Sequence, residues 1–185
     1  MVELHPLAID GPIELRPKRF FDERGFFSEV WRDEWLADAG VNVRFVQDNH
    51  SFSNRRGVLR GLHYQLAPAA QDKLVRVGRG SIFDVAVDVR AGSPTFGQWA
   101  GVTLSSEMWN QLFIPSGFAH GFVALEDNTE VLYKASSSYS PECERSVRFD
   151  DPEIGVDWPV DASELLVSSK DAAAPLLSNA EAMTS

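Results

Sequence analysis

Four histidines are the side chains of this sequence best suited to moving protons or binding metal. His63 lies in Arg60-Gly-Leu-His-Tyr-Gln65 and His120 in Pro115-Ser-Gly-Phe-Ala-His120, both in segments rich in aromatic and apolar residues. The other two, His5 and His50, are interpreted as packed or surface residues. An imidazole exchanges protons near neutral pH because its reference pKa is about 6.5. His63 and His120 are therefore the candidates for acid–base chemistry or metal ligation.

Metal binding is the first of these chemistries to test. A mononuclear site needs three or four convergent His or carboxylate ligands, commonly with two histidines at positions i and i+2 of one strand. Residue 65 is Gln, and His-x-His occurs nowhere in the sequence. The stretch Pro115-x-Gly-x-x-His120 resembles the second half of the cupin signature, but the ligand-bearing first half is missing. The sequence therefore predicts a cupin-like barrel without its metal site.

Nucleophilic and dinucleotide chemistry have little support. The sequence contains no Gly-x-Ser-x-Gly elbow, no Walker loop and no Gly-x-Gly-x-x-Gly motif. Its one cysteine, Cys143, lies between two glutamates, which disfavour a thiolate. Proton transfer without a cofactor remains, and the polar side chains available for it are His63, Lys73, His120, Tyr133 and Asp171.

Short strands must position these groups, because segments rich in Val, Phe, Ile and Leu alternate with clusters of Gly, Pro, Ser, Asp and Asn. The clearest strand is 83–89, where Phe83 and Val85 face one side while Asp84 and Asp88 face the other. That alternation is typical of a sheet with one apolar face. Further strands are predicted at 58–64, 73–77, 99–104, 111–114, 121–124 and 131–134.

The sequence predicts few helices. One short helix is predicted from Asp33 as N-cap to Ala39, with Gly40 as its stop signal. A single helical turn is predicted at 169–173, before Pro175. The predicted fold class is therefore all-β, a cupin-like jelly-roll β-barrel with a few short helices.

Length and charge set outer limits on structure and partners. The 185 residues, 44% of them hydrophobic, contain no repeat or linker, so we expect a single domain over 1–185 with a frayed tail after Leu177. A net charge of −10 argues against nucleic acid or an anionic membrane as partner. The longest uncharged run, 108–125, contains polar residues and cannot span a membrane. An N-terminal segment interrupted by acids and prolines is unlike a secretory signal, which favours a cytoplasmic protein.

Ten short motifs of this sequence occur in the same order as in a known protein family. They are Gln47-Asp-Asn49, Arg56 to Gln65, Lys73 to Arg76, Phe83 to Asp88, Ser93 to Gly97, Ile114 to Phe122, Leu132 to Lys134, Asp151-Pro152, Asp157 to Pro159 and Ser169 to Pro175. Together they resemble the dTDP-4-dehydrorhamnose 3,5-epimerase family from about residue 20 to residue 177. The resemblance implies a metal-free, cofactor-independent cupin, usually a homodimer, in dTDP-L-rhamnose biosynthesis. Its substrate would be dTDP-4-dehydro-6-deoxy-D-glucose, a dTDP-4-keto-6-deoxyhexose, and its product dTDP-4-dehydro-L-rhamnose.

The resemblance also implies residue roles. His63 would be the general base, Asp171 the carboxylate that orients it, and Tyr133 the general acid. Lys73 would lie near the C4 oxygen of the sugar, with His120 beside it. The implied substrate contacts are Arg24 and Arg60 for the diphosphate, Glu29, Gln47 and Asn49 for the nucleotide, Tyr139 by stacking on thymine, and Glu144 and Lys170 at further contact positions. Where the family often has two tyrosines before Ser140-Pro141, this chain has Ser138-Tyr139.

The chemistry of a carbon next to a ketone supports this division of roles independently. Such a carbon loses a proton only if the charge can move onto the ketone oxygen, so a base is needed beside carbon and a cation beside oxygen. His63 and Lys73 suit those two tasks. Inversion also needs a proton returned from the opposite face, for which Tyr133 is suited.

Each role has a plainer alternative. Tyr133 also fits a barrel-lining aromatic, Lys73 a strand-edge cation, and Asp171 the N-cap of the last helical turn. Two further functions stay open: an epimerase that inverts only C3 or only C5, and a cupin that binds a sugar nucleotide without catalysis.

Strand geometry sets one condition on the site. Regular alternation places Arg60 and His63 on opposite faces of their strand, whereas the site needs both inside the barrel. A bulge or bend at Gly61 would reset the alternation.

Overall fold

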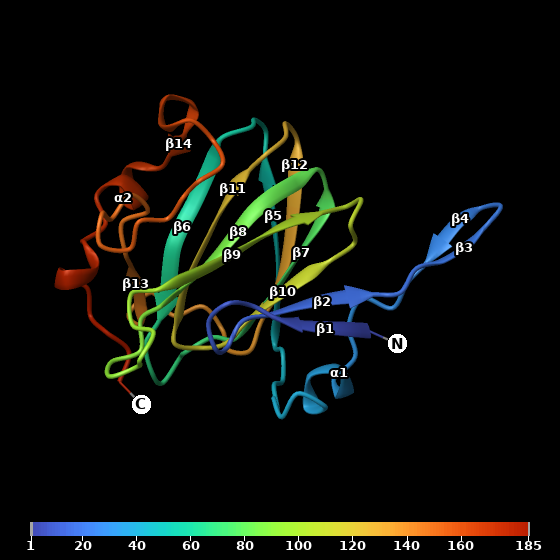
Figure 1. Cartoon of the computed structure of the whole chain (residues 1–185), viewed down its shortest axis with the longest axis horizontal. Helices are drawn as coiled ribbons and strands as arrows, with labels where there is room; N and C mark the ends of the chain where they lie inside the picture. Colours follow the sequence, from blue (N-terminus) through green and yellow to red (C-terminus); the bar gives the residue numbers. More distant parts are fainter. Residues whose placement is uncertain (1, 185) are drawn as a thin grey trace.

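Two facing β-sheets form the body of the computed structural model, which describes residues 2–184 (Figure 1). The first sheet has the order β1-β2-β10-β7-β12-β5, with the bounds Val2–Pro6, Ile13–Pro17, Gln111–Ile114, Lys73–Arg79, Thr129–Ala135 and Gln47–Ser53. The second has the order β13-β6-β11-β8-β9, with the bounds Glu144–Ser146, Val58–Gln65, Phe118–Ala124, Ser81–Asp88 and Trp99–Ser105. The short strand β14, Leu166–Val167, pairs in parallel with β6. This is the all-β, cupin-like jelly roll that the sequence predicts.

The strands predicted from apolar alternation are all present and mostly longer than expected. Those that the pattern does not predict are β1, β2, β5, β13 and β14, together with the small hairpin of β3 and β4, Phe20–Asp22 and Gly25–Phe27. Strand β5 reads Gln-Asp-Asn-His-Ser-Phe-Ser and contains few strand-favouring residues. It is held by pairing along its whole length with β12. Tertiary pairing, rather than local propensity, therefore defines this strand.

Strand β8 differs from its prediction in an important way. Val85 and Val87 form one apolar face, as expected, but Asp84 and Asp88 on the other face are also fully buried. The valine face packs under the C-terminal segment, residues 177–183. Ala86, on the aspartate face, belongs to the core between the two sheets. The strand has the one apolar face that the pattern predicts, and both faces are buried because a second layer covers the sheet from outside.

The C-terminal segment supplies that outer layer, and in Figure 1 it runs along the side of β6. Leu177 is buried, and Ala180 and Met183 pack against the same cluster as Val85. The backbone N–H of Met183 donates to Val89 at 2.8 Å, and its carbonyl accepts from Ala91 at 2.8 Å. The end of the chain therefore differs from the expected frayed tail, because its apolar residues are docked on the barrel.

The helices are short, as predicted. They are α1 at Glu34–Ala37, α2 at Ser169–Ala172, and single 3-10 turns η1 at Ala162–Glu164 and η2 at Leu177–Asn179. Asp33 occupies the N-cap position of α1, but its side chain makes no capping bond and instead accepts from the indole of Trp31 at 3.0 Å. Gly40 has a φ of 76° and follows the helix as the predicted stop signal. No helix within residues 2–184 is long and apolar enough to cross a membrane.

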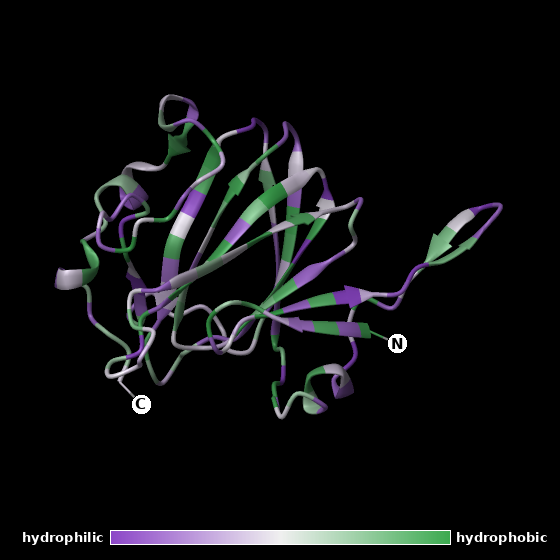
Figure 2. Ribbon diagram, in the orientation of Figure 1, coloured by the Kyte–Doolittle hydropathy of each residue, from purple (hydrophilic) through white to green (hydrophobic). Residues whose placement is uncertain are grey.

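The β3–β4 hairpin projects away from the barrel (Figure 1). Phe20, Phe21, Phe26 and Phe27 are all exposed on it, and Phe21 and Phe27 are 69% and 68% accessible. Figure 2 shows hydrophobic strands and a hydrophilic tip in this hairpin. A surface this apolar is typical of an interaction site.

Candidate functional site

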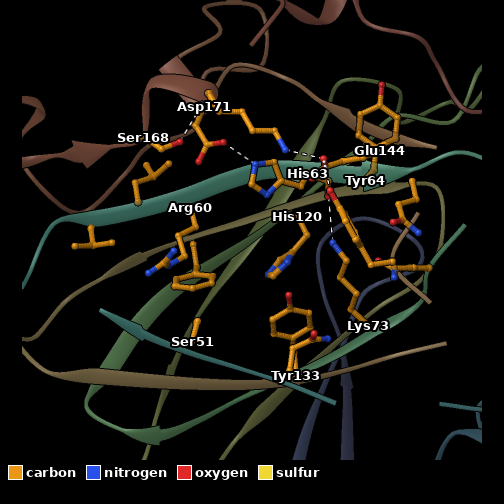
Figure 3. A pocket seen from close by; sticks show the side chains of 18 of the residues that line it. Ser51, Arg60, His63, Tyr64, Lys73, His120, Tyr133, Glu144, Ser168 and Asp171 are labelled. Carbon is orange, nitrogen blue, oxygen red and sulfur yellow. Dashed lines mark hydrogen bonds and ion pairs between the residues drawn. The ribbon is translucent and has the colours of Figure 1, made fainter. Parts of the chain in front are cut away.

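A cavity of about 620 Å³ opens into the barrel between the two sheets (Figure 3). Eleven of the thirteen predicted site residues line this cavity, all except Arg24 and Glu29. They are Gln47, Asn49, Arg60, His63, Lys73, His120, Tyr133, Tyr139, Glu144, Lys170 and Asp171. They come from six strands of the two sheets, from the loop that carries Tyr139 and from helix α2. The fold therefore gathers into one cavity groups that are far apart in sequence.

His63 and Asp171 form an ion pair at the mouth of the cavity, here called the mouth pair. His63 Nε2 lies 2.7 Å from Asp171 Oδ1, and the imidazole is 31% exposed while the carboxylate is buried. The other carboxylate oxygen accepts the backbone N–H of Gly61 at 3.3 Å. A carboxylate can only accept, so Nε2 carries the proton and Nδ1 is left as the basic nitrogen.

Helix α2 holds Asp171 in place, and it does so through Ser168. The Ser168 hydroxyl accepts the backbone N–H of Asp171 and is the N-cap of the helix. Asp171 is therefore not the cap, which removes its plainer interpretation. Burial by itself would raise the pKa of Asp171, but hydrogen bonds from His63 and Gly61 outweigh it and lower that pKa. The carboxylate thus stays ionised beside the imidazole.

Strand β6 contains, at Gly61, the irregularity that lets Arg60 and His63 both face the cavity. His63 pairs with His120 and Arg60 pairs with Phe122, so three steps along β6 oppose two along β11. The register shift is the predicted bulge, and Gly61 has a φ of 131° within it. A Cβ on Gly61 would lie 2.5 Å from the Cα of Gly121, so only glycine fits. Arg60 and His63 consequently line the same cavity.

A second pair lies deeper and is here called the floor pair. His120 Nε2 lies 2.6 Å from Asp84 Oδ1, and the two side chains are 7% and 0% exposed. Burial lowers the pKa of His120 and outweighs the opposing attraction of Asp84. This imidazole is therefore neutral at neutral pH, with its Nε2–H donated to the carboxylate.

Lys73 lies beside both pairs and is buried, which rules out its interpretation as a strand-edge cation. Its ammonium donates to the backbone carbonyl of His63 at 3.2 Å. Burial lowers the pKa of Lys73 to about 8, against the opposing attraction of Asp84 and Glu144. A poorly hydrated cation of this kind can stabilise a negative charge that develops on a bound substrate.

Tyr133 faces the cavity from the opposite wall, since it lies on β12 of the first sheet whereas His63 lies on β6 of the second (Figure 3). Burial raises the pKa of Tyr133, while the charge of Arg60 acts in the opposite direction. The phenol therefore keeps its proton at neutral pH. A base on one wall and a protonated acid on the other is the arrangement that inversion at carbon requires.

The outer part of the cavity holds a polar network around Tyr139. Its phenol donates to Glu144 at 3.0 Å, and Lys170 donates to the same carboxylate at 2.6 Å. Gln47 accepts the backbone N–H of Tyr139 at 3.0 Å and donates to Asn49 at 2.9 Å. The ring itself is 54% exposed, so one of its faces is available to a planar ligand.

Arg24 and Glu29 do not line this cavity. Arg24 lies at the turn of the β3–β4 hairpin, where it pairs with Asp22 at 2.5 Å, and Glu29 pairs with Arg32. Arg24 thus belongs to the hairpin that projects from the barrel, and Glu29 lies just after that hairpin. Within one chain, the structure therefore does not bring them to the other site residues.

Ser51 and Asp84 are among the polar residues of the interior that the sequence does not predict as site residues. Ser51 lines the cavity and follows Gln47 and Asn49 at the two-residue spacing of one strand face, a signal that becomes readable once β5 is recognised. Asp84 was assigned to the polar face of β8, and only the packing reveals that it contacts His120. Within residues 2–184, no group of three or more His, Cys, Asp or Glu is arranged to hold a metal ion.

The fold and this interior define a cupin-like barrel equipped with acid–base groups. The family model described as dTDP-4-dehydrorhamnose 3,5-epimerase matches residues 6–179, and the chain belongs to that family of isomerases. It is 54% identical over 174 residues to the dTDP-4-dehydrorhamnose 3,5-epimerase of Salmonella typhimurium strain LT2, which covers 94% of each chain.

Two solved structures extend the comparison. The epimerase of Legionella pneumophila Philadelphia 1, solved in complex with dTDP-4-keto-L-rhamnose, superposes with a TM-score of 0.91 at 47% identity and covers 97% of this chain and 94% of its own. A 3′-monoepimerase from Streptomyces bikiniensis in complex with dTDP-quinovose superposes with a TM-score of 0.87 at 39% identity and covers 94% of this chain and 87% of its own.

Proposed function

We propose that this protein converts dTDP-4-dehydro-6-deoxy-D-glucose to dTDP-4-dehydro-L-rhamnose by inverting C3 and C5 of the sugar. The observation that supports this mechanism is the placement of His63 and Tyr133 on opposite walls of one cavity. Each inversion requires removal of a proton from one face of the sugar ring and delivery of a proton to the other.

The reaction begins when Nδ1 of His63 removes the proton from a carbon next to the C4 ketone. The electron pair moves onto the C4 oxygen, and the Lys73 ammonium stabilises the enolate. Asp171 stabilises the imidazolium and fixes the ring orientation. Tyr133 then delivers its proton to the opposite face, and both groups exchange protons with solvent before the next inversion.

The rest of the cavity binds the nucleotide end of the substrate. Arg60 contacts the diphosphate, since a guanidinium forms strong paired hydrogen bonds to phosphate oxygens. Tyr139 stacks on the thymine ring, and the polar side chains around it hold the nucleotide: Gln47, Asn49, Glu144 and Lys170. These contacts lie away from the reacting carbons, whereas His120 contacts the sugar from the floor of the cavity beside Lys73.

A homodimer completes this site in our proposal. An isolated two-stranded hairpin is marginally stable in water, and the β3–β4 hairpin carries four exposed phenylalanines. A second copy of the chain would cover that surface. Arg24 and Glu29, which do not reach their own cavity, would then contact the diphosphate and nucleotide bound by the partner copy. We also propose a cytoplasmic location, in keeping with the single free thiol of Cys143.

A single-position epimerase is the second candidate function. It is favoured by one observation, the similarity to the 3′-monoepimerase from Streptomyces bikiniensis. The same base and acid serve either inversion, so the shape of the cavity decides how many carbons react. A non-catalytic sugar-nucleotide-binding protein is the third, and it would need none of the mouth-pair chemistry.

Proton NMR of the substrate in deuterium oxide tests the mechanism and separates these functions. We expect the wild type to exchange the protons at C3 and C5, and His63→Ala to exchange neither, because loss of a general base typically costs about 10²- to 10⁴-fold. Tyr133→Phe keeps the base and should exchange at least one position with little inverted product. Exchange at only one carbon in the wild type would indicate a single-position epimerase, and binding without exchange would indicate a non-catalytic protein. Wild-type exchange in His63→Ala would rule out His63 as the base.

A further inference from the structure

Asp84 is a buried carboxylate that the mechanism above does not use. It lies on β8 with its side chain 0% exposed, and it does not line the cavity. Burying an ionised carboxylate costs free energy unless the charge is paired and hydrogen-bonded. A residue that costs stability in the interior of a barrel therefore calls for an explanation in terms of its neighbours.

The hydrogen bonding of Asp84 is incomplete among the residues that the structure describes. Oδ1 accepts from His120 at 2.6 Å, whereas Oδ2 is buried and has no hydrogen-bond partner. Asp88, four residues along on the same face, provides the contrast. It is equally buried, but its oxygens are satisfied by Arg90, Ser93 and Thr95. Hydrogen bonds therefore compensate the cost of burying the Asp88 carboxylate, whereas they compensate that of Asp84 only in part.

Accepting the proposed function, we infer that Asp84 is a positioning residue that acts through His120 and Lys73. It fixes the His120 ring with Nε2–H donated to the carboxylate, and it supplies the negative charge that keeps the buried Lys73 protonated. Asp84 itself does not touch the substrate.

The first consequence concerns His120. With Nε2–H committed to Asp84 and the ring neutral, Nδ1 carries a lone pair and can only accept a hydrogen bond. His120 therefore accepts from a hydroxyl of the bound sugar and does not donate to the C4 oxygen. The developing oxyanion is left to Lys73.

The second consequence concerns Lys73, which several titratable groups face. Glu144 on β13 and Asp84 on β8 are the acidic neighbours whose charges favour its protonated form. The remaining neighbours that line the same cavity are His63 on β6, His120 on β11 and Tyr133 on β12. Because burial already lowers the pKa of Lys73 to about 8, loss of the Asp84 charge would lower it into the working range of the enzyme.

The pH dependence of kcat in Asp84→Asn tests this inference. The variant keeps the shape of the side chain and removes its charge, so the basic limb of kcat should move by about one pH unit toward acid. KM should change little, because the enolate is stabilised by Lys73 only as the reaction proceeds. Asp84→Ser, smaller and also neutral, should show the same shift. Direct titration of the Lys73 Cε signal by NMR, assigned by its absence in Lys73→Met, should show the same lowering of the pKa.

Asp88→Asn is the matched control, since it removes a carboxylate from the same face of the same strand. It should lower the melting temperature and leave the basic limb of kcat where it is in the wild type. Binding of dTDP and the melting temperature are measured for every variant to verify the fold. An unchanged basic limb and an unchanged Lys73 titration in folded Asp84→Asn would overturn the inference. The proposed function is tested separately, by solvent exchange at C3 and C5 in the wild type and in His63→Ala, and neither measurement depends on Asp84.

Discussion

Two histidine–carboxylate pairs face one cavity from neighbouring strands, and they differ mainly in depth. The mouth and floor pairs have nearly equal separations, 2.7 and 2.6 Å, and His63 lies directly opposite His120 in the sheet register. The mouth imidazole is 31% exposed and the floor imidazole 7%. Burial keeps the floor imidazole neutral, whereas the mouth imidazole can reach solvent to exchange a proton. The same pair of side chains therefore suits a base at one depth and a fixed hydrogen-bond acceptor at the other.

The two pairs are also assembled differently. Asp84 and His120 lie on adjacent strands β8 and β11, within the rigid second sheet. Asp171 reaches His63 from a helix 108 residues further along the chain, and it depends on the Ser168 cap and on docking of the C-terminal segment. The floor is thus part of the barrel, whereas the mouth needs a helix from near the end of the chain.

The largest expected effect comes from breaking the mouth pair. Asp171→Asn should lower kcat by about 10²- to 10⁴-fold, because the amide no longer stabilises the imidazolium or enforces the Nε2–H tautomer. Solvent exchange at C3 and C5, followed by NMR, should fall in parallel with kcat. Ser168→Ala is a milder variant of the same pair and should reduce kcat less, since it removes only the cap that holds the carboxylate. Near wild-type turnover in Asp171→Asn would show that His63 needs no carboxylate.

The site residues at the mouth and at the floor of the cavity were not equally predictable from the sequence. His63, Tyr133 and Lys73 were predictable because they occur in motifs whose order resembles one family, and the bulge at Gly61 followed from strand parity. Asp84 was not, because alternation alone assigns it to a polar face. Whether that face meets water depends on the first sheet, which packs against it and which no local pattern reveals.

Strand β5 illustrates the same limit at the wall of the cavity. Its inward residues Gln47, Asn49 and Ser51 are polar because they face the cavity, and its outward residues are exposed. A strand with two polar faces has no apolar period, so its sequence is typical of a loop. This polar wall of the cavity therefore escapes prediction from a hydrophobic pattern, unlike β6, β7 and β12, whose other residues are apolar enough to show one.

A smaller effect is expected at the floor, where charge opposes stability. The pKa of Lys73 falls from 10.5 to about 8 on folding, which corresponds to about 3 kcal/mol of destabilisation below pH 8. Lys73→Met should therefore raise the free energy of unfolding at neutral pH by about 1–3 kcal/mol. Since the unfolded chain binds the proton more tightly, this gain should shrink as the pH rises from about 8 to 10.5. Urea unfolding across that range measures it, and a variant less stable than the wild type at neutral pH would contradict this account.

The smallest expected effect is that of metal removal on turnover. This test distinguishes the two histidine–carboxylate pairs from the ligand set of a metal-binding cupin. Gln65 follows His63 at i+2, where such a site commonly has a second histidine. Its amide nitrogen donates to the Ala69 carbonyl at 2.6 Å, and its oxygen accepts the Ser140 N–H at 2.8 Å, so the side chain holds the loop that carries Tyr139. The two imidazole Nε2 atoms are committed to Asp171 and Asp84. We therefore expect turnover to be unchanged after exhaustive EDTA treatment and gel filtration, assayed with and without added divalent metal. Loss of activity that Zn²⁺ or Mn²⁺ restores would mean that one of the two pairs binds metal rather than moving or orienting protons.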